Sequence, residues 1–300
     1  PLQVMKKLHE RAALLRAVRF FFEIHEYLEV ETPVRNPVLI PETNILPVVS
    51  DGFFLQTSPE LCMKRLLSRG YGKIFQICKC FRGQERGNRH LPEFTMLEWY
   101  RVQGDYQSLM SETADLLKFL AGKICGCSGF DPTIVAVLQQ PSEFITVRDA
   151  FAMYTSYTAE QAIVDNCFDE QLVEYIEPVL GLRQPCFLYD YPAALGSLAR
   201  KKKSDGSLAE RFELYVQGVE LANGFSELTD GPEQRRRFEI ELEVARGTGL
   251  PQAAMPEKFL RDLDVMPEAC GIALGFDRLV MLLTGAATID EVVSSTPEEL

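Results

Sequence analysis

The sequence has 300 residues, of which 46% are hydrophobic, and its formal net charge is −12. This composition supports a sizeable buried core and excludes long disordered tracts. The acidic charge argues against a global basic surface for nucleic acid, although it does not exclude a local basic cleft. No apolar run approaches the ~18 residues of a membrane span and no signal peptide opens the sequence, so we expect a cytoplasmic protein.

Eight cysteines are present, and four of them form two C-x-C pairs, Cys78/Cys80 and Cys125/Cys127. This spacing is tighter than the C-x-x-C hooks of zinc ribbons, and no histidine lies near enough in sequence to complete a familiar zinc pattern. We therefore expect reduced thiols and no zinc site.

The first elements read as a helix, a strand and a second helix. Apolar side chains such as Leu15, Val18 and Phe22 recur at helical spacing and predict an amphipathic helix over residues 4–28. Pro33 then favours an extended backbone before it.

A strand is predicted at residues 53–56, followed by a helix. Ser58 would cap this helix, Pro59 would be its first residue and Glu60 would lie in its first turn, where the helix dipole favours a carboxylate. Capping alone is a sufficient explanation for all three residues, so a binding role stays open at this point.

Two strands are expected at residues 73–82 and 93–101, joined by a polar, arginine-rich loop. In the second strand Glu98 and Tyr100 share one side, while Leu97 and Trp99 point to the other. A carboxylate beside a phenol can bind an ammonium group. The alternative is an ordinary half-exposed edge strand.

The rest of the chain mixes helices and strands without a regular βαβ alternation. We expect helices at 106–121, 159–180 and 279–285, a loop at 125–132, a solvated mobile basic loop at 199–207, and strands at 186–193, 211–228 and 271–278. This order predicts an α+β fold with a largely antiparallel sheet in a single domain.

Two glutamates in the stretch "ELYVQGVELANGFSEL" form a candidate metal site. If Gln217-Gly218 is a two-residue hairpin turn, Glu213 opposes Ala222 and shares one face with Glu220. Two such carboxylates repel each other unless a cation lies between them, and oxygen ligands of this kind suit Mg²⁺. The alternative is a pair of solvent-facing glutamates on an antiparallel sheet.

Two arginines complete a candidate nucleotide site. Arg82 ends the strand before the polar loop and Arg278 follows "GIALGFD" near the C-terminus. Arginine presents a rigid bidentate fork to phosphate, and no G-x-x-x-x-G-K-[ST] loop occurs. Magnesium and two arginines together describe a triphosphate site of another kind.

These stretches resemble the class II aminoacyl-tRNA synthetases. "FRGQERGNRHLPEFTMLEWYR" resembles their motif 2, "GIALGFDRLVMLL" their motif 3, and the helix running into "EVETPV" their motif 1, while "ELANGFSELTD" is similar to lysyl-tRNA synthetases. The resemblance implies the class II catalytic fold over residues 1–300. Because motif 1 begins within the first residues, we expect no N-terminal anticodon-binding domain. The chain then resembles stand-alone paralogues that join a lysine-type amino acid to elongation factor P.

The resemblance also implies residue roles. Catalysis would rest on Arg82 and Arg278. ATP would be bound by Arg82, Gly83, Gln84, His90, Leu91, Glu220, Leu221, Gly275 and Arg278. The amino acid would be bound by Ser58, Pro59, Glu60, Glu98, Tyr100, Glu227 and Ala273. Mg²⁺ would be held by Glu213 and Glu220.

Four positions depart from the pattern of these synthetases. Gln84 replaces an expected glutamate and Leu91 an expected asparagine, which bears on ATP affinity. Ser58 and Ala273 stand where alanine and glycine are usual, and a single methyl group is worth about 1–3 kcal/mol in a pocket. These two would bias the enzyme toward β-lysine over α-lysine.

The implied reaction is an ATP-dependent and Mg²⁺-dependent activation of lysine or (R)-β-lysine, followed by transfer to a lysine of elongation factor P. Neither tRNA nor a membrane is an expected partner, and motif 1 implies a homodimer. Two alternatives remain: a lysyl-tRNA synthetase catalytic domain that charges tRNA, and a non-catalytic regulatory subunit.

Overall fold

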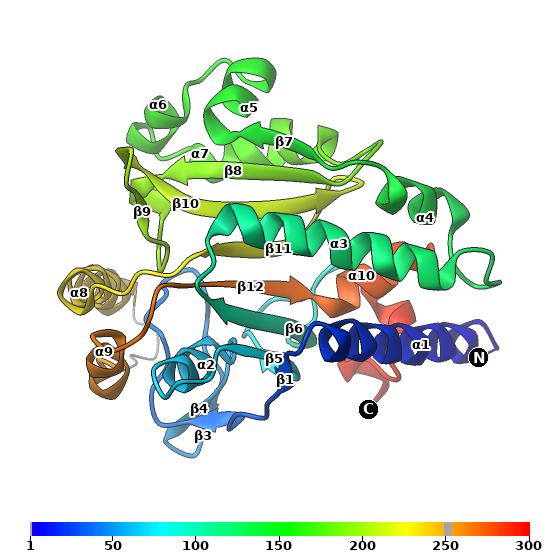
Figure 1. The fold of residues 1–300 in the computed structure, drawn as a ribbon, viewed down its shortest axis with the longest axis horizontal. Helices are drawn as coiled ribbons and strands as arrows, with labels where there is room; N and C mark the ends of the chain where they lie inside the picture. Colours follow the sequence, from blue (N-terminus) through cyan, green and yellow to red (C-terminus); the bar gives the residue numbers. More distant parts are fainter. Residues whose placement is uncertain (1, 249–253) are drawn as a thin grey trace.

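The computed structural model describes residues 2–248 and 254–300 (Figure 1). Its centre is a nine-stranded sheet in which all neighbouring strands pair antiparallel except β1 with β5 and β7 with β8. The strands lie in the order β1 (Leu28–Glu29), β5 (Lys73–Phe81), β6 (Glu93–Val102), β12 (Ala269–Gly275), β11 (Val219–Ser226), β10 (Asp205–Val216), β8 (Cys186–Pro192) and β7 (Glu143–Thr146), with β9 (Lys201–Lys202) on β10. The predicted α+β class is confirmed.

One face of the sheet is covered by α1 (Leu2–Ile24), α3 (Tyr106–Ile124) and α10 (Phe276–Leu283), as Figure 1 shows. The main hydrophobic core lies beneath them, and it contains Leu97 and Trp99. The Trp99 ring packs edge-on against Phe22 of α1, with 5.2 Å between centroids. The predicted alternation along β6 is therefore confirmed: its apolar residues face the helices, and Glu98 and Tyr100 face away.

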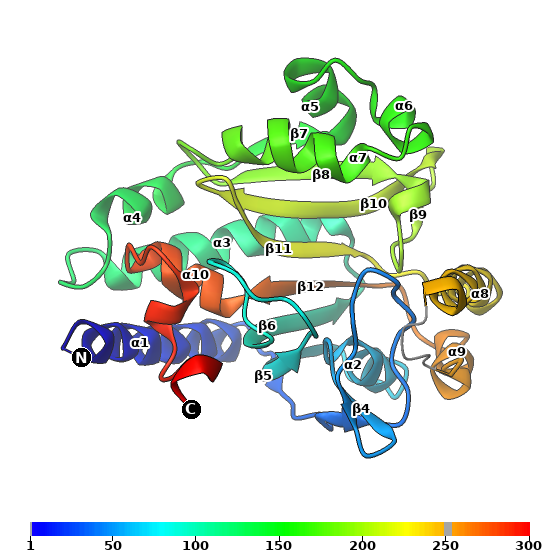
Figure 2. The ribbon, with the colours of Figure 1, turned by 180° about the vertical axis from the view of Figure 1, so that it is seen from behind.

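The opposite face is seen in Figure 2. The segment between β2 (Arg35–Asn36) and β3 (Val49–Ser50) crosses it, and β4 (Phe53–Leu55) joins these two in a small separate sheet. The flank beyond β5 and β6 carries α2 (Glu60–Leu67), α8 (Gly231–Thr248) and α9 (Glu257–Leu263), whose apolar residues form a second core with Tyr100. The site described below lies on this face.

The far edge of the sheet carries a third core. It is formed by α5 (Val147–Tyr154), α6 (Ala159–Val164), α7 (Phe168–Gln171), a π-helical turn (Leu172–Ile176) and a 3₁₀ turn (Glu177–Val179), packed on β8 and β10. A further helix, α4 (Pro132–Gln139), contacts α3. None of the helices within the described ranges is long and apolar enough to cross a membrane.

Several predicted boundaries are corrected. The first helix ends at Ile24 and not at residue 28, because Glu26 adopts a left-handed conformation with φ 60°. The helix predicted at 159–180 is broken, since Asn166 has φ 54°. Helix α2 begins at Glu60, with Pro59 at its N-cap, although the Ser58 hydroxyl still accepts from the Glu60 N–H at 3.0 Å.

Other predictions failed because tertiary pairing decides them. The sequence pattern predicts no helix or strand between residues 132 and 154, but this segment forms α4, β7 and α5. Residues 199–207 are not a free loop: β9 pairs with the start of β10, and Lys202 Nζ lies 2.5 Å from Asp190 Oδ2. The last helix starts at Phe276, ahead of the predicted residue 279.

Candidate active site

Two adjoining cavities occupy the open face of the sheet. The first has a volume of about 240 Å³ and the second about 370 Å³. Their walls have six residues in common: Glu42, Ile45, Arg82, Met96, Asn223 and Ala273. A ligand can therefore extend from one cavity into the other past the Arg82 guanidinium, at the end of β5.

The first cavity is lined by cations. Arg82 stacks its guanidinium over the Phe94 ring at 5.2 Å and its buried Nε has no hydrogen-bond partner within the described part of the chain. Arg278 on α10 donates from Nη1 to the Glu220 carbonyl at 2.9 Å, and its Nη2 lies 2.5 Å from His90 Nε2. Arg89 lines the same cavity. Three guanidinium groups in one cleft favour a polyanion such as a triphosphate.

Only some of the predicted residues in the loop between β5 and β6 line the first cavity. His90 and Leu91 line the first cavity as expected. Gln84 is exposed, has φ 61° and does not line the cavity, whereas its neighbour Glu85 does. Gly83 also lies off the cavity wall and approaches the preceding loop, where a Cβ would come within 2.9 Å of Leu46. Glu85 thus takes the position expected for Gln84.

Strands β11 and β12 supply the opposite wall of this cavity through Glu220, Leu221 and Gly275. A Cβ added at Gly275 would meet nothing nearer than Arg278 Cδ at 3.6 Å, so the protein itself does not require glycine there. The absence of a side chain leaves a flat surface on which a planar ring can lie.

The predicted metal ligands are on one face but engage different neighbours. The turn at Gln217-Gly218 forms as expected, with positive φ at both residues. A bulge after Leu214 then shifts the register, so that Glu213 opposes Asn223 and not Ala222. The prediction of Ala222 as the partner was wrong because a one-residue bulge cannot be read from an alternating pattern.

Glu213 is already saturated with donors. The hydroxyls of Tyr191 and Tyr215 donate to its Oε2, both at 2.6 Å, and Arg211 donates to its Oε1 at 2.7 Å. Burial and then the nearby Glu213 raise the pKa of Glu220. No cluster of three or more metal-ligating side chains occurs within residues 2–248 and 254–300. The two carboxylates still fit Mg²⁺, which often takes one or two carboxylates together with phosphate oxygens, and Glu220 is the freer ligand.

An acidic cluster lies directly behind the second cavity. Glu60 lines the cavity, while Glu98, Tyr100 and Glu227 are buried behind it, with exposures of 1%, 2% and 0%. Tyr100 donates to Glu98 Oε1 at 2.5 Å, and Ser58 donates to Glu98 Oε2 at 2.8 Å. The expected substrate-binding residues therefore come together, but three of them stand one layer behind the cavity surface.

Lys64 of α2 lies within this cluster. Its Nζ is 2.5 Å from Glu60 Oε1, forms an ion pair with Glu227 Oε2, and lies 5.0 Å from the centre of the Phe225 ring. Burial opposes the charge on Lys64, but Glu227 and Glu60 outweigh it and raise the pKa of the ammonium. Lys64 thus stays protonated among these carboxylates.

The cluster has more carboxyl groups than cations. Burial raises the pKa of Glu98 to about 8, with Glu60 adding to the effect, and burial likewise raises the pKa of Glu227 to about 8 despite Lys64. Three carboxylates and one ammonium leave two negative charges when all four groups are ionised. A ligand with ammonium groups would remove that imbalance.

The remaining predicted residues differ in position. Ser58 and Ala273 line the second cavity, and Ala273 lies between both cavities. Pro59 is buried and off the cavity wall, so its role is to start α2. A Cβ at Gly271 would come within 2.2 Å of the Tyr100 ring, so glycine lets that ring lie against β12.

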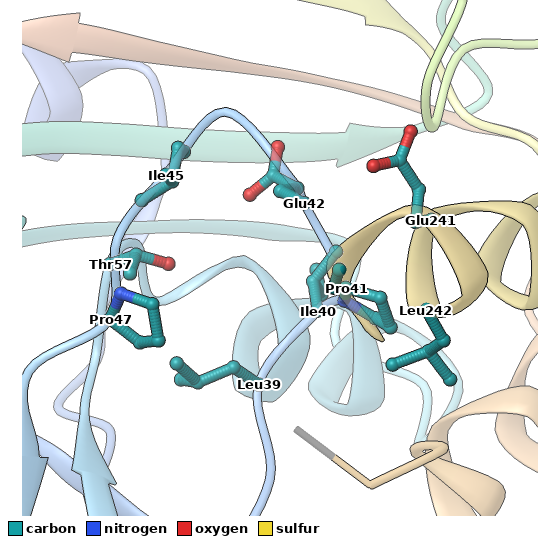
Figure 3. A pocket seen from close by; sticks show the side chains of 10 residues that line it. Leu39, Ile40, Pro41, Glu42, Ile45, Pro47, Thr57, Glu241 and Leu242 are labelled. Carbon is teal, nitrogen blue, oxygen red and sulfur yellow. The ribbon is translucent and has the colours of Figure 1, made fainter. Parts of the chain in front are cut away.

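A loop over residues 39–47 closes one side of both cavities. It is tied to α8 because Thr43 donates from its backbone N and its hydroxyl to Glu241 Oε2, at 2.9 and 2.8 Å. Figure 3 shows the small space of about 30 Å³ that remains between this loop and α8, with Glu42 and Glu241 at its rim. Burial, with a contribution from Glu60, raises the pKa of Glu42 to about 7.

Sequence reasoning missed several residues of the site. Lys64 was passed over because a lysine in a helix is normally exposed, and its side chain is 1% exposed here. Tyr191 reaches Glu213 from β8, a contact that only the β8–β10 pairing creates, whereas Arg211 and Tyr215 lie two residues from Glu213 on the same face of β10. Asn223 lines both cavities, and it was missed because its position opposite Glu213 depends on the bulge after Leu214.

Comparison with known proteins places this geometry in a family. The class II tRNA synthetases (D, K and N) match residues 2–295. A protein of Edwardsiella ictaluri (strain 93-146) named elongation factor P–(R)-β-lysine ligase is 38% identical, with 98% of this chain and 96% of that protein covered. Proteins of the same name from Salmonella dublin and Salmonella arizonae are 36% and 37% identical, with 99% of this chain and 96% of each relative covered. The chain therefore belongs to the class II tRNA synthetase family, together with these ligases.

Proposed function

We propose that this protein activates (R)-β-lysine, and lysine more weakly, as an aminoacyl-adenylate and transfers the aminoacyl group to a lysine side chain of elongation factor P. The observation that carries the proposal is the junction of two cavities, one with Arg82, Arg89 and Arg278 in its wall and the other backed by buried carboxylates. The names of the relatives support the choice of substrates.

In the first step the amino-acid carboxylate attacks the α-phosphorus of ATP and pyrophosphate leaves. Arg82 lies where the two cavities meet, so its guanidinium can stabilise the charge that develops on the reacting phosphate and carboxylate. Arg278 would hold the far end of the triphosphate. Catalysis then rests on positioning and charge, as is general in phosphoryl chemistry.

Glu220, with Glu213 beside it, would hold Mg²⁺, which when bound neutralises phosphate charge. Glu213 would have to release a tyrosine or arginine donor to become a ligand. Its more direct role is to fix Tyr191 and Arg211 on the wall of the second cavity, with Tyr215 buried behind them.

In the second step the ε-amine of the acceptor lysine attacks the carbonyl of the adenylate. An amide bond forms, the acyl–phosphate bond breaks and AMP leaves with the electron pair. No side chain of the enzyme has to form a covalent intermediate, and accordingly no serine or cysteine nucleophile is assigned.

Pyrophosphate exchange tests the first step. We expect ATP–pyrophosphate exchange that depends on β-lysine or lysine, and its loss in Arg82→Ala. An absence of amino-acid-dependent exchange in the parent protein would contradict the proposal and would favour a regulatory, non-catalytic role.

A homodimer is part of the proposal, as are a single catalytic domain, a cytoplasmic location and an acceptor other than tRNA. The support for a dimer is an apolar surface on α1 and the strand after it, where Phe20, Ile24 and Leu28 are 44%, 51% and 50% exposed. Light scattering should give twice the mass of the 33.9 kDa chain. A monomer that retains full exchange activity would remove the dimer from the proposal.

A further inference from the structure

Lys64 is the one cation paired within the acidic cluster of Glu60, Glu98 and Glu227, within the described residues. It is not on the cavity surface, since its side chain is 1% exposed. A buried ion pair is costly unless its geometry is well satisfied, so this arrangement calls for an explanation beyond packing.

One oxygen of a carboxylate that pairs with Lys64 has no hydrogen-bond partner within the described residues. Glu227 Oε2 pairs with Lys64, but Glu227 Oε1 is buried without a hydrogen-bond partner, although Glu227 is 0% exposed. That oxygen faces the Tyr100 ring across Gly271, where a Cβ would meet both groups. A buried carboxylate oxygen without a hydrogen-bond partner is suited to accept from an ammonium group.

We propose that Lys64 is a specificity-determining positioning residue: its ammonium, fixed between Glu60 and Glu227, offsets part of the carboxylate charge of this cluster and leaves the remainder for the two ammonium groups of a diamino acid. This inference rests on the proposed function. A subsite of this kind disfavours amino acids with an uncharged side chain, because their binding would leave buried carboxylates without counter-charges.

The electrostatic surroundings of Lys64 support this role. The charged and titratable groups around it are Glu42 from the 39–47 loop, Glu60 from α2, Glu98 and Tyr100 from β6, Glu227 after β11 and Cys270 from β12. Lys64 lowers the pKa of Glu98 and of Glu227 against the effect of burial. Without Lys64, both carboxyls would hold their protons to a higher pH.

The test is the pH profile of the KM for β-lysine, measured by pyrophosphate exchange. In Lys64→Met, which keeps the apolar stem, we expect a KM at least tenfold higher near pH 7.5 and a profile displaced upward by more than one pH unit. Lys64→Arg keeps the charge and should leave the position of the profile unchanged. A Lys64→Met profile that coincides with that of the parent would overturn the inference, as would a displaced profile in Lys64→Arg.

Chemical rescue separates charge from packing. Lys64→Ala removes the atoms of propylammonium, so added n-propylammonium should restore the KM and its pH profile while n-propanol should not. Equal rescue by both compounds would show a packing role only. If Lys64→Ala and Lys64→Met do not fold, the pH profile of the KM for β-lysine in Lys64→Arg still tests the inference. A parent without exchange would instead count against the proposed function.

Discussion

The two halves of the site recognise charge by opposite means. The nucleotide half has arginines on the wall of an open cavity, where a guanidinium is charged whether or not it has a partner. The amino-acid half hides carboxylates at 0–1% exposure, where burial raises their pKa. Under the proposed function, phosphate would be recognised by cations at the cavity surface, whereas an ammonium group would be recognised by a balance of buried charges that pH can shift.

The largest effect is expected from Arg82→Ala, because Arg82 belongs to both cavities. Loss of one charge-stabilising donor typically costs about 10²–10³-fold in kcat, so exchange should fall by at least that factor. Arg148→Ala is the matched control, since the Arg148 side chain is 66% exposed and forms an ion pair with the exposed Glu160 at 3.9 Å. A similar loss in both variants would show that the effect is on folding.

Glu227→Gln should affect the amino-acid half alone. The variant keeps the shape of the side chain but removes the charge that pairs with Lys64 and that would accept from the substrate. A charged hydrogen bond contributes about 1.5–3 kcal/mol, so we expect the KM for β-lysine to rise by about 10–100-fold. The KM for ATP should stay within a few-fold of the parent value, and an equal rise in both constants would contradict the separation of the two halves.

The pH dependence should likewise differ between the halves. The pKa of Glu98 and of Glu227 is raised to about 8, so below that pH these carboxyls are neutral and cannot pair with an ammonium group. We expect the KM for β-lysine to fall by roughly 20-fold from pH 6.5 to pH 8.5, as for one group with a pKa of about 8, and the KM for ATP to change little.

The same shift has a consequence for stability. Because the folded-state pKa of both carboxyls is raised, the ligand-free protein should lose stability as the pH rises from about 4.3 through about 8. Thermal melting across this range checks the sign, and saturating β-lysine should reduce the loss. A melting temperature of the ligand-free protein that rises toward pH 8 would contradict the claim that burial raises the pKa of these two carboxyls.

The smallest effect is expected from Ala273→Gly. Ala273 lines both cavities, and the loss of its methyl group widens the place where the acyl group would lie. We expect the ratio of kcat/KM for β-lysine to that for lysine to fall by about tenfold, the lower end of what one methyl group supplies. An unchanged ratio would remove Ala273 from the determinants of specificity.

The sequence predicts those parts of the fold that local pattern controls. The alternation of Glu98 and Tyr100 against Leu97 and Trp99 sets the two faces of β6, and Gln217-Gly218 sets the hairpin turn. Both features follow from the alternation of side chains along a strand and from turn geometry, which involve only a few consecutive residues.

What the sequence could not predict depends on contacts between distant segments. The bulge after Leu214 shifts the partner of Glu213 by one residue without a signal in the alternating pattern. The burial of Lys64 needs Glu227, which follows β11 far along the chain. Most residues to which the family resemblance assigned roles lie on the walls of the two cavities or directly behind them, but Pro59, Gly83 and Gln84 do not, and the resemblance did not include Lys64.

The identity of the acceptor is the most direct test of the whole account. The purified protein is given ATP and (R)-β-lysine together with either elongation factor P or tRNA specific for lysine, and both acceptors are analysed by mass spectrometry. We predict that elongation factor P gains the mass of one β-lysyl group on a lysine side chain and that the tRNA stays uncharged. Aminoacylated tRNA with unmodified elongation factor P would contradict the account and would show a synthetase.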